Sequence, residues 1–172
     1  MERVVANSKG VSYPAINESE MATYEVAAPP EAEQRAIAAF LDRHPDFRED
    51  ITFFAMLQPS RQDVPEYVEY VERITDLVSH INTKHGNTDW MPIDLRFESN
   101  LPLAITAYKH FDVMMVNSIF DGMNLVAKEF IASRDDELGV LILSQFTGAA
   151  RELHEALIIN PYHIEQGAQA LY

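Results

Sequence analysis

The residues best suited to chemistry form one short turn that joins an apolar strand to a helix. Residues 112–129 read DVMMVNSIFDGMNLVAKE, and the polar turn within them runs from Asp121 to Asn124. A glycine at position 122 permits a positive φ or a close approach of a ligand to the backbone. The first N–H groups of the following helix have no acceptor within the helix and can bind an anion. This pattern favours a site for a diphosphate group.

Two carboxylates flank the start of this helix. Asp121 precedes it and Glu129 follows eight residues later, which places their α-carbons roughly 12 Å apart along the helix axis. A nucleotide sugar has a comparable reach, so one carboxylate could bind hydroxyls of a hexose and the other those of a ribose, with neither acting as an acid or base. The alternative is structural: Asp121 is then an N-cap and Glu129 a solvated helix residue. The local pattern alone favours this alternative.

The elements that must position this turn alternate between strands and helices. Short apolar runs predict strands at residues 51–57, 93–97, 113–116, 140–143 and 156–159. Apolar residues at helical spacing predict helices at residues 32–43, 64–86, 103–111, 122–132, 149–154 and 164–171. Asp63 is expected to act as the N-cap of the second of these helices.

This alternation predicts an α/β fold with a mainly parallel sheet and helices on both faces. Residues 1–30 show no sustained period and are expected to form an irregular segment, whereas residues 31–172 form one domain. Ligands of such sheets bind outside the carboxyl ends of the strands. Function is therefore expected in the loops that follow the strands.

Composition excludes several classes of function. The formal net charge of −14 would repel nucleic acid and anionic lipid. The absence of cysteine rules out disulfides and thiolate zinc sites, and the six histidines include no pair at helical i, i+4 spacing, so no metal is expected. No apolar run is long enough to span a bilayer, and the first residues lack the apolar stretch of a secretion signal. A soluble, cytoplasmic protein is expected.

Four strings give the chain a family resemblance: FFAMLQPSRQDVPEYVEYVERI at 53–74, NTDWMPI at 87–93, DGMNLVAKEF at 121–130 and GVLILSQFTGAARELHEALIINP at 139–161. In this order they resemble the C-terminal domain of the trehalose-6-phosphate synthase family, over about four-fifths of the chain. The nine-residue string DGMNLVAKE after an apolar strand is the most specific part. It is supported by the spacing of Ser144, Gly148, Ala149 and Ala150.

The resemblance implies a GT-B glycosyltransferase, in which two Rossmann-like domains face a cleft and the C-terminal one holds the nucleotide donor. It implies retaining transfer of glucose from UDP-glucose to glucose 6-phosphate, without a metal or other cofactor. The acceptor is held by an N-terminal domain that this sequence does not contain. By itself the chain is therefore expected to be inactive, and that domain or another chain is its expected partner.

The resemblance also implies roles for individual residues. The donor sugar would contact Asp121 and the backbone of Gly122, Met123 and Asn124. The amides of Leu125 and Val126 would lie by the phosphates, and Glu129 would bind the ribose hydroxyls. The loop after Phe97, around Ser99 to Leu101, would line the pocket for the base.

The start of the chain departs from the family pattern. Family members place an arginine and a lysine on the first loop of this domain, where they contact the phosphates. Arg3 and Lys9 resemble this pair, but their spacing is one residue longer and the intervening aspartate is absent. Either the loop is degenerate or the start is unrelated sequence. A sheet without its usual first strand would expose an apolar seam, which either the N-terminal segment or another chain would cover.

Two other functions stay open at this point. The chain could be a non-catalytic or degenerate GT-B domain with a regulatory or nucleotide-binding role. It could also belong to a related synthase with another acceptor, such as glycerol 3-phosphate. The sequence leaves the oligomeric state open, including a homo-oligomer.

Overall fold

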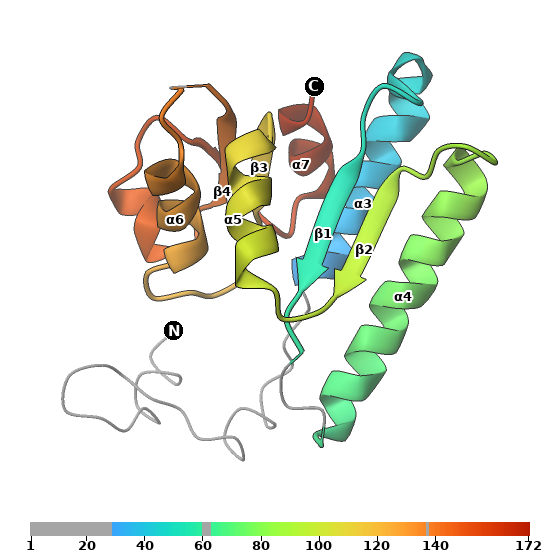
Figure 1. The fold of residues 1–172 in the computed structure, drawn as a ribbon, viewed down its shortest axis with the longest axis horizontal. Coiled ribbons are helices and arrows are strands. Elements are labelled where there is room, and N and C mark those ends of the chain that lie inside the picture. Colours follow the sequence, from blue (N-terminus) through green and yellow to red (C-terminus); the bar gives the residue numbers. More distant parts are fainter. Residues whose placement is uncertain (1–28, 60–62, 137) are drawn as a thin grey trace.

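The computed structural model describes residues 29–59, 63–136 and 138–172. All strand pairs within them are parallel, and they form two sheets (Figure 1). The first sheet pairs β1 (Phe53–Leu57) with β2 (Ile93–Phe97). The second has the order β3 (Val113–Val116), β4 (Val140–Ser144) and β5 (Leu157–Ile159). The prediction of an α/β fold with parallel strands is confirmed.

The described residues also form five α-helices and two 3-10 turns. The α-helices are α3 (Pro29–Arg43), α4 (Pro65–His85), α5 (Leu101–His110), α6 (Leu125–Ser133) and α7 (Ile164–Ala170), and the 3-10 turns are η1 (Pro45–Phe47) and η2 (Gly148–Arg151). The segment before α3 lies outside the described residues, so the division into residues 1–30 and 31–172 stays a prediction.

The helix starts differ from the prediction because caps are set by details that spacing does not reveal. Helix α4 begins at Pro65 after Val64, which makes no side-chain cap, so the expected Asp63 cap is wrong. Proline is favoured at the first helical position because its missing N–H is not needed there. Helix α5 begins two residues early because the Asn100 side chain accepts a hydrogen bond from the Leu103 N–H.

Two further elements differ from the prediction. Strand β1 begins at Phe53 rather than residue 51, and its side chains are half-buried along its whole length rather than fully covered. The helix expected at 149–154 is the shorter 3-10 turn η2. The β2 and β3 bounds match the prediction.

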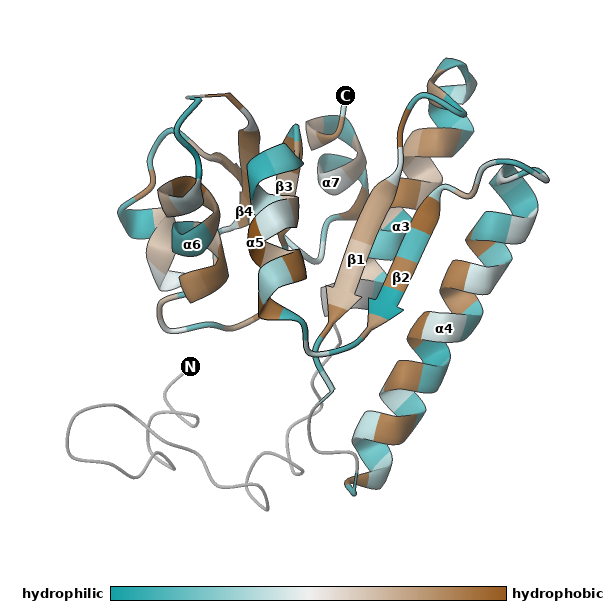
Figure 2. Ribbon diagram, in the orientation of Figure 1, coloured by the Kyte–Doolittle hydropathy of each residue, from teal (hydrophilic) through white to brown (hydrophobic). Residues whose placement is uncertain are grey.

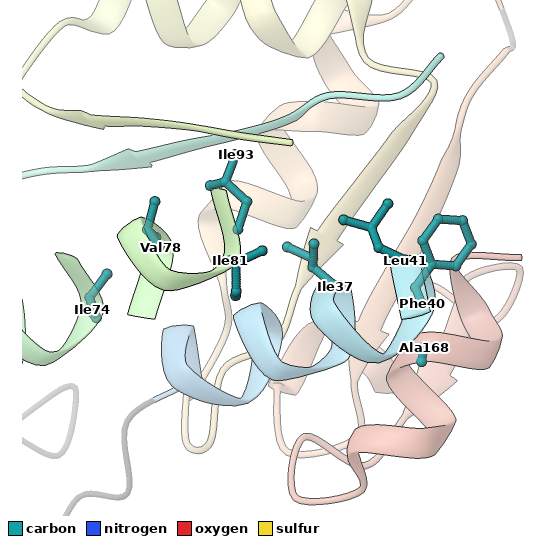
Figure 3. Packing of buried hydrophobic residues seen from close by; sticks show 8 residues of the cluster. All are labelled: Ile37, Phe40, Leu41, Ile74, Val78, Ile81, Ile93 and Ala168. Atoms are coloured by element: carbon teal, nitrogen blue, oxygen red, sulfur yellow. The ribbon is translucent and has the colours of Figure 1, made fainter. Parts of the chain in front are cut away.

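The main core lies between the first sheet and the helices α3, α4 and α7. Figure 3 shows its apolar side chains converging from these helices and from the start of β2. They are Ile37, Phe40, Leu41, Ile74, Val78, Ile81, Ile93 and Ala168. A second core fills the space between the second sheet and α6, with Leu143, Ala127 and Phe130 at its centre.

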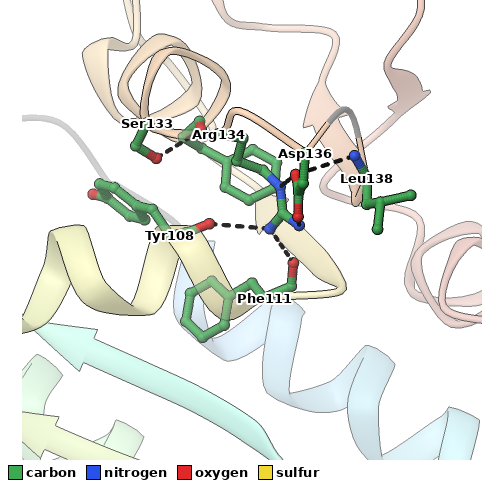
Figure 4. Close-up of polar contacts among 7 residues, drawn as sticks. Tyr108, Phe111, Ser133, Arg134, Asp136 and Leu138 are labelled. Carbon is green, nitrogen blue, oxygen red and sulfur yellow. Dashed lines mark hydrogen bonds and ion pairs between the residues drawn. The ribbon is translucent and has the colours of Figure 1, made fainter.

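Arg134 fixes α6 against α5 (Figure 4). Its Nη1 donates to the carbonyl oxygens of Tyr108 at 3.1 Å and Phe111 at 2.5 Å, at the C-terminal end of α5. Its Nε and Nη2 bind both carboxylate oxygens of Asp136, at 3.0 and 2.7 Å, and this pair holds the pKa of Asp136 below its usual value. A cation at a helix C-terminus is favourable. The orientation of α6, and of the turn before it, is thereby set.

No helix of the described residues is long and apolar enough to cross a membrane.

Candidate functional site

The turn from Asp121 to Asn124 lies between β3 and α6. Figure 1 shows that α5 and α6 both begin at the edge of the fold where β1 and β2 end. This is the carboxyl edge of the parallel strands, where ligands of such folds bind. The sequence prediction placed the site at this edge, and the location of the turn agrees with it.

The Asp121 carboxylate holds the turn in shape. Its Oδ1 accepts hydrogen bonds from the backbone N–H groups of Met123 at 3.1 Å and Asn124 at 2.8 Å. Its Oδ2 accepts one from the Asn124 side chain at 3.0 Å. With three donors already on the carboxylate, Asp121 acts here as a positioning residue of the turn. The structural alternative, in which Asp121 is the N-cap, is wrong, because the helix begins three residues later than predicted.

Asn124 is the N-cap of α6, and the sequence interpretation did not assign it that role. Its Oδ1 accepts from the Ala127 N–H at 2.9 Å, and its Nδ2 also donates to the Ser118 hydroxyl at 3.1 Å. The residue is buried and has φ of 67°. Asparagine is favoured both as an N-cap and in the left-handed region. This combination, directly before an apolar helix, was the signal that could have identified it.

Replacing Asn124 by alanine is expected to lower the free energy of unfolding by about 2 kcal/mol, because it removes the cap and leaves a β-carbon in the left-handed region. Asn124→Gly removes the same hydrogen bonds without that strain, and should cost about 1 kcal/mol less. Urea unfolding of both variants measures the difference. Equal losses for the two variants would contradict the strained position of Asn124.

A second segment, residues 146–149, forms backbone hydrogen bonds with the turn. The N–H groups of Gly148 and Ala149 donate to the carbonyls of Asp121 at 3.0 Å and Met123 at 2.9 Å. A β-carbon on Gly148 would overlap the Gly122 carbonyl oxygen and lie 2.9 Å from the Gly122 carbonyl carbon. Of the two expectations for Gly122, the positive φ is wrong, whereas the open space around its α-carbon leaves the approach of a ligand a prediction. The close approach between two segments of the protein backbone is made by Gly148.

Two backbone N–H groups at the start of α6 are available to a ligand. The Ala127 N–H is capped by Asn124, but those of Leu125 and Val126 have no acceptor among the residues that the structure describes. Their side chains are 60% and 40% exposed, and that of Met123 is exposed beside them. Large apolar side chains around unpaired N–H groups indicate a surface that a ligand or another domain covers.

Glu129 lies one turn further along α6, on the same side as Leu125 and Val126. It is exposed, and within the described ranges it forms no ion pair or hydrogen bond. The pKa of Tyr108 on α5 is raised by burial and, secondly, by the charge of Glu129. The Glu129 carboxylate therefore lies on the side of α6 that faces α5.

The remaining predicted site residues fall in two places. The loop from Ser99 to Leu101 lies between β2 and the start of α5, also at the carboxyl edge, with Ser99 and Leu101 exposed. Arg3 and Lys9 lie outside the described residues. The structure therefore brings together the turn, the α6 amides and Glu129 on one element, and it leaves the basic pair unplaced.

The same edge contains three polar groups that the sequence interpretation missed, and two of them, Gln34 and Asn117, are buried. Glu33 and Gln34 lie in the first turns of α3, and Asn117 directly follows β3. The Asn117 N–H donates to the Glu33 carboxylate, while the side-chain oxygens of Gln34 and Asn117 have no partner among the described residues. Burial is the larger influence on Glu33, and it raises the pKa of this carboxyl to about 7.

Comparison with known proteins agrees with this geometry. The model of glycosyltransferase family 20 matches residues 31–172. The chain is 39% identical over 138 residues to an alpha,alpha-trehalose-phosphate synthase [UDP-forming] of Pichia angusta, covering 80% of this chain and 29% of that protein. It is 43% identical over 142 residues to a bifunctional trehalose-6-phosphate synthase/phosphatase of Thermoproteus tenax, covering 80% of this chain and 19% of that protein.

Solved structures give the same result. An alpha,alpha-trehalose-phosphate synthase (UDP-forming) from Burkholderia xenovorans, in complex with glucose-6-phosphate, is similar with a TM-score of 0.81 and 32% identity, over 83% of this chain and 32% of that one. An E. coli trehalose-6-phosphate structure bound with UDP-2-fluoro glucose has a TM-score of 0.79 and 36% identity, with the same coverage. The chain thus spans about a third or less of these relatives, and it belongs to glycosyltransferase family 20.

Proposed function

We propose that this chain forms the donor-binding half of a retaining trehalose-phosphate synthase and binds the nucleotide sugar UDP-glucose at the start of α6. The observation that carries the proposal is the pair of unpaired N–H groups at Leu125 and Val126, held in place by the rigid turn before them. Backbone N–H groups at a helix N-terminus bind phosphate without any basic side chain. A strongly acidic chain can bind a diphosphate in this way.

The parts of the donor are assigned by their distance from these N–H groups. The diphosphate lies at Leu125 and Val126, and the ribose hydroxyls bind Glu129, one helical turn further. The glucose lies over the backbone of the turn at Gly122, whose α-carbon faces open space. A relative with bound UDP-2-fluoro glucose supports a nucleotide sugar of this kind.

The chemical task of the site is to stabilise negative charge on the departing diphosphate. Fixed N–H dipoles act well on such charge because they need no reorganisation during the reaction. The turn is fixed by Asp121, Asn124 and Gly148, so the dipoles of α6 are preorganised. We propose that the acceptor, glucose 6-phosphate, is held by a further domain, and that the chain of 172 residues has no transferase activity by itself.

Calorimetric titration with UDP-glucose, UDP and GDP-glucose tests the proposal. Saturable binding of UDP-glucose and UDP is expected. Glu129→Ala should weaken binding by about 10-fold or more, because it removes hydrogen bonds between a charged group and the ribose. Glu72→Ala, an exposed glutamate of α4 far along the chain from the turn, is the matched control and should leave binding unchanged.

Absence of binding by all three nucleotides in a folded chain would overturn the proposal, and would favour a non-catalytic member of the family. Equal weakening in both variants would overturn the assignment of Glu129. Tighter binding of GDP-glucose would overturn the choice of uridine.

A further inference from the structure

The two sheets leave a slot between β1 and β3. Among the described residues, β1 pairs only with β2, and β3 pairs only with β4. Each of the two strands therefore has one edge without a partner. Because both strands belong to parallel ladders that run toward the same carboxyl edge, a strand between them could be parallel to both (Figure 1).

The hydrogen bonds show which backbone groups face this slot. The Phe53 N–H donates to Pro92 next to β2, so by alternation the N–H and C=O groups of Phe54 and Met56 point to the opposite edge. Likewise the Asp112 C=O accepts from Val140 at the start of β4, so the backbone groups of Val113 and Met115 point away from β4. Unpaired backbone groups thus line both sides of the slot.

The sequences of these two strands are those of interior strands. Strand β1 is FFAML and β3 is VMMV, with no charged residue in either. Figure 2 shows β1 apolar along its length, whereas β2 carries hydrophilic residues. The β2 residues Asp94 and Arg96 form an exposed ion pair. Exposed edge strands are usually protected by charge, so the apolar β1 is unsuited to be an edge.

Helix α3 gives the direction from which the missing strand comes. It leads through η1 into β1 and packs on α4, the helix that connects β1 to β2. A helix in this position connects two parallel strands in a right-handed crossover, and a strand before α3 would occupy the slot next to β1. Figure 1 shows that α3 begins near the edge where β1 ends, which is where such a strand would finish.

Buried polar groups at the carboxyl end of the slot provide an independent observation. By the same alternation as Val113 and Met115, the backbone of Asn117 faces the slot, and its N–H is bound by the Glu33 carboxylate rather than by a strand. The side-chain oxygens of Gln34 and Asn117 are buried without a partner among the described residues. Such groups are usually satisfied, so a further hydrogen-bond donor belongs here.

We propose that the slot is occupied by one parallel strand supplied by residues 1–28 of this same chain. These 28 residues end directly at Pro29, at the correct edge, and a five-residue strand needs only about 17 Å of extended chain. The completed order is β2, β1, the new strand, β3, β4 and β5. This is the doubly wound order whose switch point is the ligand site. The apolar seam expected from the sequence is thereby closed within the chain.

Two stretches of this segment contain residues that favour strands. They are residues 3–6 (RVVA) and residues 22–26 (ATYEV). The second would leave only two residues before α3, a common length for such a connection. Proline cannot donate to a ladder, so it disrupts whichever stretch pairs. The paired variants Val4→Pro/Val5→Pro and Thr23→Pro/Val26→Pro therefore separate the two stretches.

The test is hydrogen exchange of individual amides by NMR, on the whole chain. The slot-facing amides of Phe54, Met56, Val113 and Met115 should exchange at least about 100-fold more slowly than unprotected amides. One proline pair should remove most of this protection, and Asn17→Pro, which lies outside both stretches, should not. The amide of Phe53, which bonds next to β2, reports whether each variant still folds.

Fast exchange of the slot-facing amides in the wild-type chain would overturn the proposal. Protection that persists in both proline pairs would also overturn it, because the occupant would then be another molecule. A loss of protection on tenfold dilution would identify that molecule as a second copy of the chain. Binding of UDP-glucose is measured separately, so failure of the strand and failure of the proposed function are distinguishable.

Discussion

Gly148→Ala is expected to lower the free energy of unfolding by more than about 3 kcal/mol, because the new methyl group has no room. A β-carbon at this position would overlap the carbonyl oxygen of Gly122 and lie 3.2 Å from the Met123 α-carbon. These are backbone atoms, which cannot rotate away as a flexible side chain would. The turn must therefore shift, and its hydrogen bonds to residues 146–149 are strained or lost.

The neighbouring glycine provides a matched control. Gly122→Ala adds the same methyl group at a position with no heavy atom within 4 Å and no positive φ, so it should change stability by less than about 1 kcal/mol. Thermal and urea unfolding of both variants measure this contrast. If the proposed donor site is correct, Gly148→Ala also abolishes UDP-glucose binding in the fraction that stays folded. Equal stability of the two variants would contradict the close approach of the two segments.

The sequence was sufficient to locate the turn but not to describe its geometry. An apolar strand, a polar turn with glycine and an apolar helix are local signals, and they placed the site between β3 and α6. The steric requirement for a glycine at position 148 depends on contacts with Gly122 and Met123, which are distant from it in sequence. The sequence interpretation therefore missed Gly148, and its N-cap alternative for Asp121 belongs to Asn124.

The same distinction holds for the sheet. The bounds of β2 and β3 followed from short apolar runs. Strand pairing depends on residues that are distant in the sequence. No local pattern indicated that β1 and β3 lie in separate sheets and do not pair with each other. Glu33 was not noticed, because a glutamate near the start of a helix normally interacts with solvent and with the helix dipole. Only the fold shows that it is buried against Asn117.

Glu33 should make the chain less stable as the pH rises from about 4.5 to about 7. Burial raises the pKa of this carboxyl from 4.5 to about 7 in the folded state. In this range the folded chain retains a proton that the unfolded chain has lost, so the free energy of unfolding falls with increasing pH. The contribution is fully present below about pH 4.5, and about 3 kcal/mol of it is lost once the pH exceeds 7.

Urea unfolding of the wild-type chain and of Glu33→Gln, from pH 4.5 to 8, measures this effect. Glutamine has nearly the same shape but no charge, so the variant should be the more stable of the two above pH 7 by up to about 3 kcal/mol, with little difference at pH 4.5. The pKa of His85 is lowered mainly by burial, so His85 also makes stability depend on pH. Because His85 and the other titratable groups are the same in both chains, their contributions disappear when one curve is subtracted from the other. Glu69→Gln, an exposed residue of α4, is the control and should follow the wild-type curve. Parallel curves for wild type and Glu33→Gln would show that Glu33 titrates alike in the folded and the unfolded chain, and that the carboxyl edge of the slot is open to water.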